Sequence, residues 1–248
     1  MTTLPEHGPI VLTGGSGRLG TELQALLPDL LAPSSRELDI TDAQSVSDYF
    51  AQHRPQAVVH AAAYTNVGSA EQERARCWQV NVVGTRHVAQ TARDAGAKLI
   101  HISTDYVFSG DEGGYRESDT PGPAVNFYSL TKLVAEEAAR LAPQHLIIRT
   151  SFRPREFQYP VAFGDVYTGQ DYVDIIAPMI AEAVTHHAQI PDEVLHIVTE
   201  RKSVYDLARR RRPDVQEGSR KEVSVTLPAD VSLNTERWEQ LRRSWQTA

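Results

Sequence analysis

The sequence predicts an α/β fold built on a doubly wound parallel sheet, with a small C-terminal portion. Short apolar runs alternate with segments of helical periodicity over the first 150 of the 248 residues. A helix between successive strands makes a right-handed crossover, which keeps those strands parallel and places helices on both faces. Apolar residues make up 41% and charged residues 23% of the chain, as in ordinary globular domains, which excludes a largely disordered protein.

The elements of this first part follow from local pattern. Leu19 to Leu27 is expected to be a helix because its leucines share one face. Thr41, with Gln44 three residues later, has the pattern of a helix N-cap. Further helices are expected at 71–95, with a break near Asn81, and at 127–141. The expected strands are 9–13, 37–40, 57–61, 98–103 and 145–149.

The pattern changes after Ser151. Residues 153–160 are proline-rich and charged, which predicts a loop. Beyond it the sequence predicts a helix at 172–184, a strand at 195–198, a helix at 203–211 and a strand at 222–227. We therefore expect a dinucleotide-binding domain at 1–150 and a small substrate or cap region at 151–248, packed on the first.

Charge and cysteine content restrict the function. The net charge of −7 argues against a general nucleic-acid binder, and we interpret the basic run Arg209–Arg212 as a solvated helix end. Cys77 is the single cysteine, which excludes an intrachain disulfide framework and fits a reducing compartment. No run reaches the length of about 18 apolar residues typical of a spanning helix, so a cytoplasmic protein without a membrane partner is expected. No metal site is expected, because His186 and His187 point to different sides of a helix.

A glycine-rich loop, residues 13–20 with the sequence TGGSGRLG, joins the first expected strand to the first helix. In that context one glycine permits a tight turn, a second lets the backbone approach a pyrophosphate, and a third lets helix and strand pack closely. The spacing fits G-x-G-x-x-G from Gly15 or G-x-x-G-x-x-G from Gly14, and the glycines alone do not choose. The loop predicts a dinucleotide site on a Rossmann-type fold.

The residues about 20 positions after the glycine loop favour NADP over NAD. An NAD site usually has an Asp or Glu about 20 residues after the glycines, hydrogen-bonded to the ribose 2′-hydroxyl. Here Ser34, Ser35 and Arg36 precede the first carboxylate, Glu37. With Arg18 from the glycine loop, two arginines and two hydroxyls suit a 2′-phosphate better than a diol.

Tyr128 and Lys132 lie four residues apart and so on one face of the expected helix. Reduction of a ketone by hydride creates an alkoxide that needs a proton donor, and a phenol can supply the proton. A nearby ammonium favours the phenolate and lowers the pKa of the phenol. Lys132 can also hold the nicotinamide ribose.

The motifs together resemble the extended short-chain dehydrogenase/reductase family, in its dTDP-4-dehydrorhamnose reductase branch. The segments that carry the resemblance are AAAYTNVGSAE from Ala61, NVVGT from Asn81 and STDYVFSG from Ser103, beside the glycine loop and Tyr128–Lys132. The resemblance covers roughly residues 9–151, and weakly 166–174. It implies an NADP-dependent reductase of a keto group on a nucleotide-sugar.

Residue roles follow from the resemblance and from the cofactor corner. The resemblance implies that Thr104 bonds the substrate carbonyl, with Ser103 a less favoured substitute, that Tyr128 donates the proton and that Lys132 assists it. The expected substrate contacts are Thr104, Asp105, Tyr106 and Val107. The expected cofactor contacts are Gly14, Gly17, Arg18, Leu19, Gly20, Ser35, Arg36, Asp39, Ile40, Ala61, Ala62, Ala63, Tyr64, Tyr128 and Lys132.

Two departures from that branch keep alternatives open. Gly68 stands where the branch usually has an acidic residue, and the helical stretch that follows Ser151 in relatives is much shorter here. A nucleotide-sugar epimerase or dehydratase is one alternative. A non-catalytic NADP-binding subunit is the other, because the regulatory beta subunit of methionine adenosyltransferase resembles the same branch. The expected partners are a nucleotide-sugar and a second copy of the chain.

Overall fold

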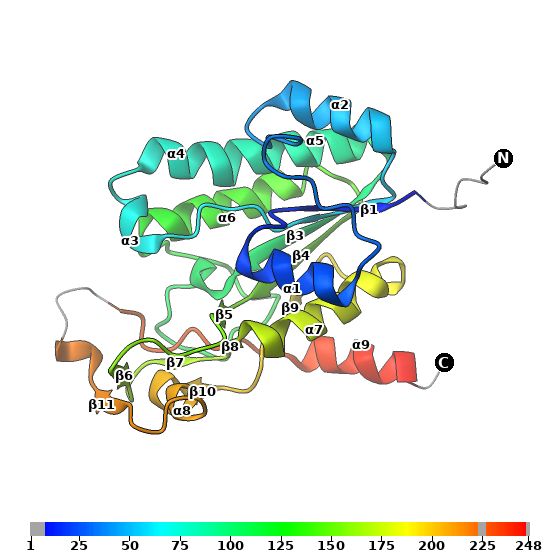
Figure 1. The fold of residues 1–248 in the computed structure, drawn as a ribbon. Coiled ribbons are helices and arrows are strands. Elements are labelled where there is room, and N and C mark those ends of the chain that lie inside the picture. The colour runs from blue at the N-terminus through cyan, green and yellow to red at the C-terminus, as the bar shows by residue number, and fades with distance from the viewer. Residues whose placement is uncertain (1–7, 223–226, 247–248) are drawn as a thin grey trace.

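A parallel five-stranded sheet forms the middle layer of the molecule, as predicted (Figure 1). The computed structural model describes residues 8–222 and 227–246. Neighbouring strands follow the order β1-β2-β3-β4-β9, and every pair is parallel. The strands are β1 (Ile10–Thr13), β2 (Ala57–His60), β3 (Lys98–Thr104), β4 (His145–Thr150) and β9 (Val194–His196).

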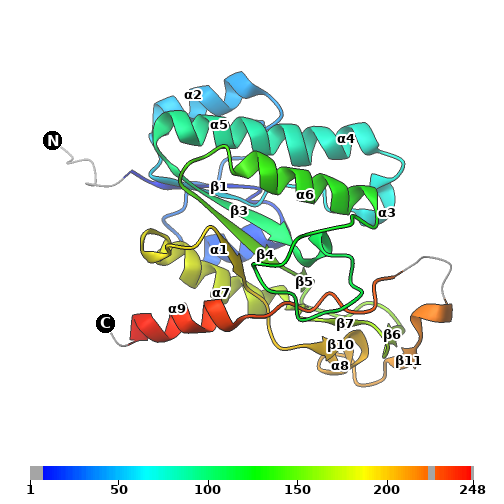
Figure 2. The ribbon, with the colours of Figure 1, turned by 180° about the vertical axis from the view of Figure 1, so that it is seen from behind.

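Helices cover both faces of this sheet, and each face has its own apolar core (Figures 1 and 2). One face packs against α1 (Arg18–Leu26), α7 (Val173–Thr185) and α9 (Glu236–Gln246). The other packs against α2 (Ala43–His53) and α5 (Thr85–Ala95), with α6 (Phe127–Ala139) beside α5. The buried β-strands are apolar on both sides because both faces are covered.

The strand expected at 37–40 is absent, and the prediction there was wrong. Glu37 accepts hydrogen bonds from the backbone amide and the hydroxyl of Ser34, both at 2.8 Å, which closes a turn. Leu38 and Ile40 are buried as parts of a loop, so their alternation mimicked a strand. The chain meets β1 instead through one isolated bridge, between Leu31 and Val11.

The start of α2 is also one residue later than expected. Asp42, not Thr41, is the N-cap, and its carboxylate accepts from the amide of Gln44 at 2.9 Å. The hydroxyl of Thr41 donates to Asp39 at 2.7 Å and is therefore not available to cap the helix.

The helical stretch expected at 71–95 is interrupted near Asn81, as predicted. It consists of α4 (Arg74–Trp78), a π-helical segment (Gln79–Gly84) and α5, preceded by the short α3 (Val67–Ala70). Gly84 lets this segment pack on the loop before α2, because a Cβ there would lie 2.8 Å from the Cδ1 of Ile40. Asn81 lies within this π-helical segment, a type of turn that often occurs at functional sites.

Residues after 151 complete the sheet and also form a separate lobe with its own apolar cluster (Figures 1 and 2). The predicted strand 195–198 is β9, and the predicted helices are α7 and α8 (Val204–Arg209). The loop expected at 153–160 starts one residue later, because Arg153 belongs to a two-residue strand. The lobe strands pair as β5 (Phe152–Arg153) with β8 (Asp171–Tyr172), β6 (Val161–Phe163) with β11 (Gln216–Gly218), and β7 (Tyr167–Thr168) with β10 (Lys202–Ser203).

Other expectations for this region have mixed outcomes. The strand expected at 222–227 falls mostly on 223–226, outside the described residues. The division at residue 150 stays a prediction. After it, β9 joins the central sheet, and α7 and α9 pack on one face of that sheet. Among the described helices, none is both long and apolar enough to cross a bilayer.

A buried ion pair joins α6 to the sheet. Arg149 on β4 is 2% exposed and donates to both carboxylate oxygens of Glu136, at 3.0 and 2.8 Å. Glu136 is 1% exposed and also accepts from the hydroxyl of Ser103 on β3 at 2.6 Å. One carboxylate therefore holds α6 against two neighbouring strands.

Replacing Arg149 by methionine is expected to lower the free energy of unfolding by about 3–5 kcal/mol, because Glu136 would remain buried without a counter-charge. Urea denaturation measures the change. Arg93→Met, which breaks the exposed Arg93–Asp94 pair, serves as the control and should cost about 1 kcal/mol or less. Equal losses in both variants would show that burial of the Glu136–Arg149 pair has no special role.

Candidate active site

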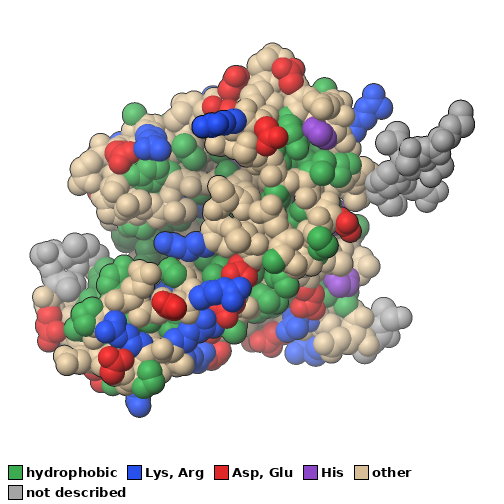
Figure 3. All heavy atoms as spheres, in the orientation of Figure 1, with side chains coloured by type: hydrophobic (Ala, Val, Ile, Leu, Met, Phe, Trp, Pro, Cys, Tyr) green, Lys and Arg blue, Asp and Glu red, His purple; other side chains and the backbone are tan. Residues whose placement is uncertain are grey.

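The residues singled out from the sequence gather at the carboxyl ends of β1, β2 and β3. Chain order reverses at β1, which has Leu31 on one side and β2 on the other. Ligands of open α/β sheets bind at such a switch point, outside the carboxyl ends of the strands. Figure 3 shows this face of the molecule hollowed between the sheet layer and the lobe of β6, β7 and α8, with Lys and Arg side chains on that lobe.

The glycine loop has the geometry of the spacing that begins at Gly14. Gly14 has φ of +77°, and a Cβ on it would lie 2.6 Å from the amide nitrogen of Ala62. A Cβ on Gly20 would overlap the carbonyl oxygen of Gly14, and the amide of Gly17 donates to that same oxygen at 2.9 Å. Glycine is therefore required where the loop turns and where α1 packs on it.

The corner next to this loop carries two unpaired cations. Arg18 and Arg36 are exposed, and the guanidinium of neither makes a hydrogen bond or ion pair with another described residue. The carboxylate of Glu37 is occupied by Ser34, whose amide and hydroxyl lower the pKa of Glu37. Asp39 is similarly occupied by Thr41 at 2.8 Å. Ser35, next to Arg36 in the chain, is also exposed.

Asn81 holds the segment that follows β2. Its side-chain oxygen accepts from the amide of Tyr64 at 2.7 Å, and its amide donates to the carbonyl of Tyr64 at 3.1 Å. The same amide reaches the hydroxyl of Thr131 on α6 at 3.0 Å. No role was assigned to Asn81 from the sequence, and the signal was its place at the predicted helix break. It ties residues 61–64 to the helix that carries Tyr128.

His60, on β2, is a core histidine with a partner at each ring nitrogen. Its Nδ1 lies 2.7 Å from the Thr13 hydroxyl and its Nε2 lies 3.0 Å from the Thr85 hydroxyl. Burial lowers the pKa of His60 to about 3, so the ring is neutral. It joins β1, β2 and α5 directly behind the glycine loop.

Tyr128 and Lys132 lie one turn apart on α6, whose start is well defined. Asn126 caps the helix by accepting from the amide of Ser129 at 2.8 Å. The ammonium of Lys132 donates to the carbonyl of Ile102 at 2.8 Å and lies 3.4 Å from Nε2 of His101. These contacts orient the lysine toward the end of β3.

Thr104 ends β3 beside this helix. Its hydroxyl donates to Asp105 at 3.0 Å and accepts from the amide of Tyr106 at 3.2 Å. Ser103, the alternative hydroxyl, is bound to Glu136 at 2.6 Å beneath α6. The structure therefore brings Thr104, and not Ser103, next to the turn Asp105–Val107 that follows the strand.

Burial dominates the electrostatics of this group. It raises the pKa of Tyr128 above its ordinary value; the Asp105 charge adds to this, and the Thr104 hydroxyl opposes it. Burial lowers the pKa of Lys132 to about 8, while the Glu136 charge raises it. The pKa of Asp105 is raised by burial to about 6, against hydrogen bonds that include one from Thr104. The lowering of the Tyr128 pKa that the sequence suggested is not found among the described residues.

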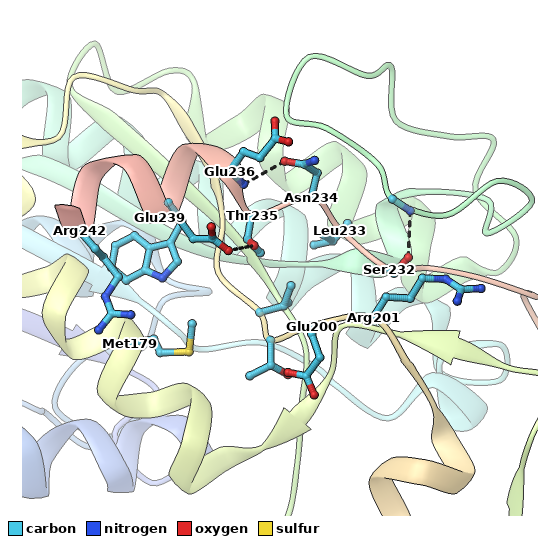
Figure 4. Close-up of a pocket in the computed structure, with 14 residues that line it drawn as sticks. Met179, Glu200, Arg201, Ser232, Leu233, Asn234, Thr235, Glu236, Glu239 and Arg242 are labelled. Atoms are coloured by element: carbon cyan, nitrogen blue, oxygen red, sulfur yellow. Dashed lines mark hydrogen bonds between the residues drawn. The ribbon is translucent and has the colours of Figure 1, made fainter. Parts of the chain in front are cut away.

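A cavity of about 550 Å³ lies elsewhere in the molecule (Figure 4). Its lining includes Met179 of α7, Glu200 beyond β9 and Arg242 of α9. β9 is the edge strand farthest from β1, so this space is distant in the sheet from the glycine loop. Several of its charged groups are already paired within the protein: Arg242 with Glu182, Arg201 with Asp230, and Glu236 with Arg116. We therefore place the candidate site at the glycine loop and Tyr128.

The two adjacent histidines are engaged locally. Nδ1 of His186 lies 3.0 Å from the carbonyl of Glu182, and Nδ1 of His187 lies 2.8 Å from that of Val184. Within 8–222 and 227–246, no three His, Cys, Asp or Glu side chains are grouped so that they could hold a metal ion.

Comparison with known proteins agrees with this geometry. The family model described as RmlD substrate binding domain matches residues 8–153. The chain belongs to this family. A dTDP-4-dehydrorhamnose reductase of Mycobacterium tuberculosis is 36% identical over 187 residues, which are 71% of this chain and 56% of that protein. One from Streptomyces griseus is 43% identical over 149 residues, 57% of this chain and 49% of that protein. The chain thus spans about half the length of these curated relatives.

Solved structures of family members match almost the whole chain. A dTDP-4-dehydrorhamnose reductase from Bacillus anthracis, in complex with NADP, has a TM-score of 0.83 and 27% identity, covering 98% of this chain and 100% of that one. A hypothetical dTDP-4-dehydrorhamnose reductase from Sulfolobus tokodaii has a TM-score of 0.82 and 29% identity, covering 94% of each chain. The extended short-chain dehydrogenase/reductase resemblance is therefore confirmed at the level of family and fold.

Replacement of Asp105 by asparagine is expected to stabilise the protein above about pH 6. The folded-state pKa of Asp105, about 6, lies above its ordinary value of 3.8, so the folded state binds more protons and wild-type stability falls as pH rises between these values. Two pKa units correspond to about 3 kcal/mol at most. Urea denaturation from pH 4.5 to 8 should show an advantage for Asp105→Asn that grows with pH.

The exposed Asp94→Asn is the control for this titration, and its difference from wild type should stay flat. If the difference in unfolding free energy between Asp105→Asn and wild type is constant across the whole pH range, the pKa of Asp105 is not raised by burial.

Proposed function

We propose that the protein is an NADPH-dependent reductase of a keto group on a nucleotide-sugar. The observation that carries the proposal is the convergence of Thr104, Tyr128 and Lys132 at the edge of the sheet where the glycine loop also lies. The curated relatives named dTDP-4-dehydrorhamnose reductase support the reaction class. The solved relative in complex with NADP supports the cofactor.

The residues at this edge fit a dinucleotide phosphate. Gly14 and Gly20 leave no room for a Cβ, which is the close backbone approach that a pyrophosphate needs. The free cations of Arg18 and Arg36 suit a 2′-phosphate. We further propose that Ala61–Tyr64, held by Asn81, and Leu19, Ser35, Asp39 and Ile40 line the rest of the dinucleotide site.

In the proposed reaction the cofactor, when bound, supplies a hydride to the carbonyl carbon. The Thr104 hydroxyl turns its proton from Asp105 to the carbonyl oxygen and holds that oxygen near Tyr128. Tyr128 gives its phenolic proton to the oxygen as the alkoxide forms, which completes the alcohol. Lys132 stabilises the phenolate left behind. Asp105, Tyr106 and Val107, in the turn after Thr104, form the wall that faces the substrate.

The remaining assignments follow from this proposal. The lobe after residue 151 is the proposed substrate portion, beside the 1–150 cofactor domain. The free, buried Cys77 is consistent with the cytoplasm as the proposed compartment. The homodimer stays a prediction. The alternative of a non-catalytic NADP-binding subunit requires no chemistry from Tyr128, and the epimerase or dehydratase alternative requires no net reduction.

Tyr128→Phe separates these readings. The variant keeps the ring and removes the proton, so turnover of keto-sugar nucleotides should fall by about 10²–10⁴-fold while NADPH affinity hardly changes. Lys132→Met should lower both the rate and NADPH affinity. NADPH oxidation and NADPH titration measure the two quantities. A wild type that binds NADPH yet reduces no keto-sugar nucleotide would favour the regulatory-subunit alternative, and a pull-down of a stable partner would be the next step.

Arg36→Ala tests the cofactor preference. Loss of one charge-assisted phosphate contact costs about 1.5–3 kcal/mol, which is roughly tenfold to a hundredfold in NADPH affinity. NADH affinity should stay nearly constant. Arg93→Ala, at the end of α5 just before β3 begins and hence at the opposite edge of the sheet, is the control. Equal losses of NADPH and NADH affinity would assign Arg36 a structural role.

A further inference from the structure

Arg153 lies just beyond the strand ends that carry the proposed chemistry. In the β3–β4 ladder, Thr150 is the direct partner of Thr104. Three residues later, Arg153 stands in β5, paired with Tyr172 of β8. The chain therefore brings Arg153 past the carboxyl edge of the sheet, beside the turn that begins at Asp105.

Several groups of the site interact electrostatically with its guanidinium. Burial lowers the pKa of Arg153, and the groups that oppose this are, in order, Tyr106, Tyr159, Tyr172 and Asp105. Tyr106 and Asp105 belong to the turn proposed to face the substrate. Arg153 is thus near the turn on the proposed substrate side of the site.

Arg153 has no ionic partner among the described residues. Its Nε is buried and makes no hydrogen bond, and no carboxylate lies within ion-pair distance. Its one specific contact is the Phe157 ring, whose centroid is 5.3 Å from the guanidinium carbon. Arg149, by contrast, is held by Glu136 at 2.8 Å, and Arg155 by Glu22 at 2.7 Å.

An unpaired arginine in such surroundings is costly unless a ligand neutralises it. A partly buried cation loses hydration and gains little from an aromatic ring alone. Asp105 does not neutralise it, since the two groups are not in ion-pair contact and the pKa of Asp105 is itself raised by burial. The phenol of Tyr106, the group that most opposes the effect of burial on Arg153, is itself a hydrogen-bond donor.

We propose that Arg153, with Tyr106, forms a subsite for an anionic group of the substrate. The group is either a phosphate of the nucleotide-sugar or a carboxylate on its sugar ring, because both present the paired oxygens that a guanidinium binds. The subsite rests on the proposed function for its place in the reaction. It assigns substrate recognition to a residue of the segment 153–160, for which the sequence predicts a loop.

Calorimetric titration of the NADPH-loaded full chain tests this subsite with two matched probe pairs. The phosphate arm compares dTDP with thymidine, and the carboxylate arm compares glucuronic acid with glucose. Wild type should bind the anionic member of one pair at least tenfold more tightly than its neutral partner. Arg153→Gln should weaken that anion by roughly tenfold to a hundredfold and leave the neutral probe unchanged. Arg153→Lys should retain part of the difference.

Two controls separate a specific loss of anion binding from a general loss of structure. Arg155→Gln, two residues away and outside the subsite, should bind all four probes as wild type does. The melting temperature of Arg153→Gln should equal or exceed that of wild type, because an unpaired buried charge is removed. Loss confined to the phosphate arm or to the carboxylate arm identifies the group. Unchanged anion binding in Arg153→Gln, or no preference for either anion in wild type, overturns the proposal.

Turnover of keto-sugar nucleotides, measured in parallel, separates this inference from the proposed function. If turnover is found and Arg153→Gln changes neither KM nor anion binding, the subsite fails and the reductase stands. If no keto-sugar nucleotide is reduced while Arg153→Gln still loses anion binding, the reductase fails and the subsite stands.

Discussion

The buried pair between Glu136 and Arg149 is the contact on which the geometry of the site depends. Glu136 follows Lys132 by one turn of α6, and its carboxylate is shared by Arg149 on β4 and Ser103 on β3. Neither charge can be displaced without leaving the other buried, so α6 has one favourable register on the two strands. That register sets Tyr128 beside the end of β3. The proposed proton donor is therefore positioned by an ion pair that itself takes no part in the chemistry.

Most of the sheet could be predicted from the sequence, because buried parallel strands are short apolar runs and their crossovers have fixed handedness. The failure at 37–40 has a local cause. Glu37 closes a turn on Ser34, and such side-chain to backbone bonds compete with a strand ladder. The two-residue strands of the lobe carry no periodicity and could not be predicted. The candidate site residues could be named from their motifs, and their roles stay predictions. The contacts of Glu136, which belongs to no motif, and of Asn81, which begins one without an assigned role, appear only in three dimensions.

The lobe after residue 151 uses its basic residues internally. Arg210 pairs with Asp171 at 3.1 Å and Arg211 with Asp174 at 2.8 Å, which joins the end of α8 to β8 and to the start of α7. Arg155 reaches Glu22 on α1 with two hydrogen bonds. Two arginines of the basic run thus form ion pairs within the protein and do not form a surface for nucleic acid. Through Arg155, the lobe is also tied to the helix that begins at the glycine loop.

The electrostatics at Tyr128 favour the reductive direction for the proposed enzyme. A phenol whose pKa is raised by burial keeps its proton at neutral pH. A proton donor must hold its proton before the reaction, whereas a general base must have lost it. In the proposed mechanism, the Lys132 ammonium, one turn along α6, stabilises the phenolate once the proton has left. The pKa of Lys132, about 8, keeps that ammonium mostly charged at neutral pH. Proton transfer is therefore unfavourable until a strongly basic alkoxide forms beside Thr104, and the site is inactive as an acid until hydride transfer creates that oxyanion.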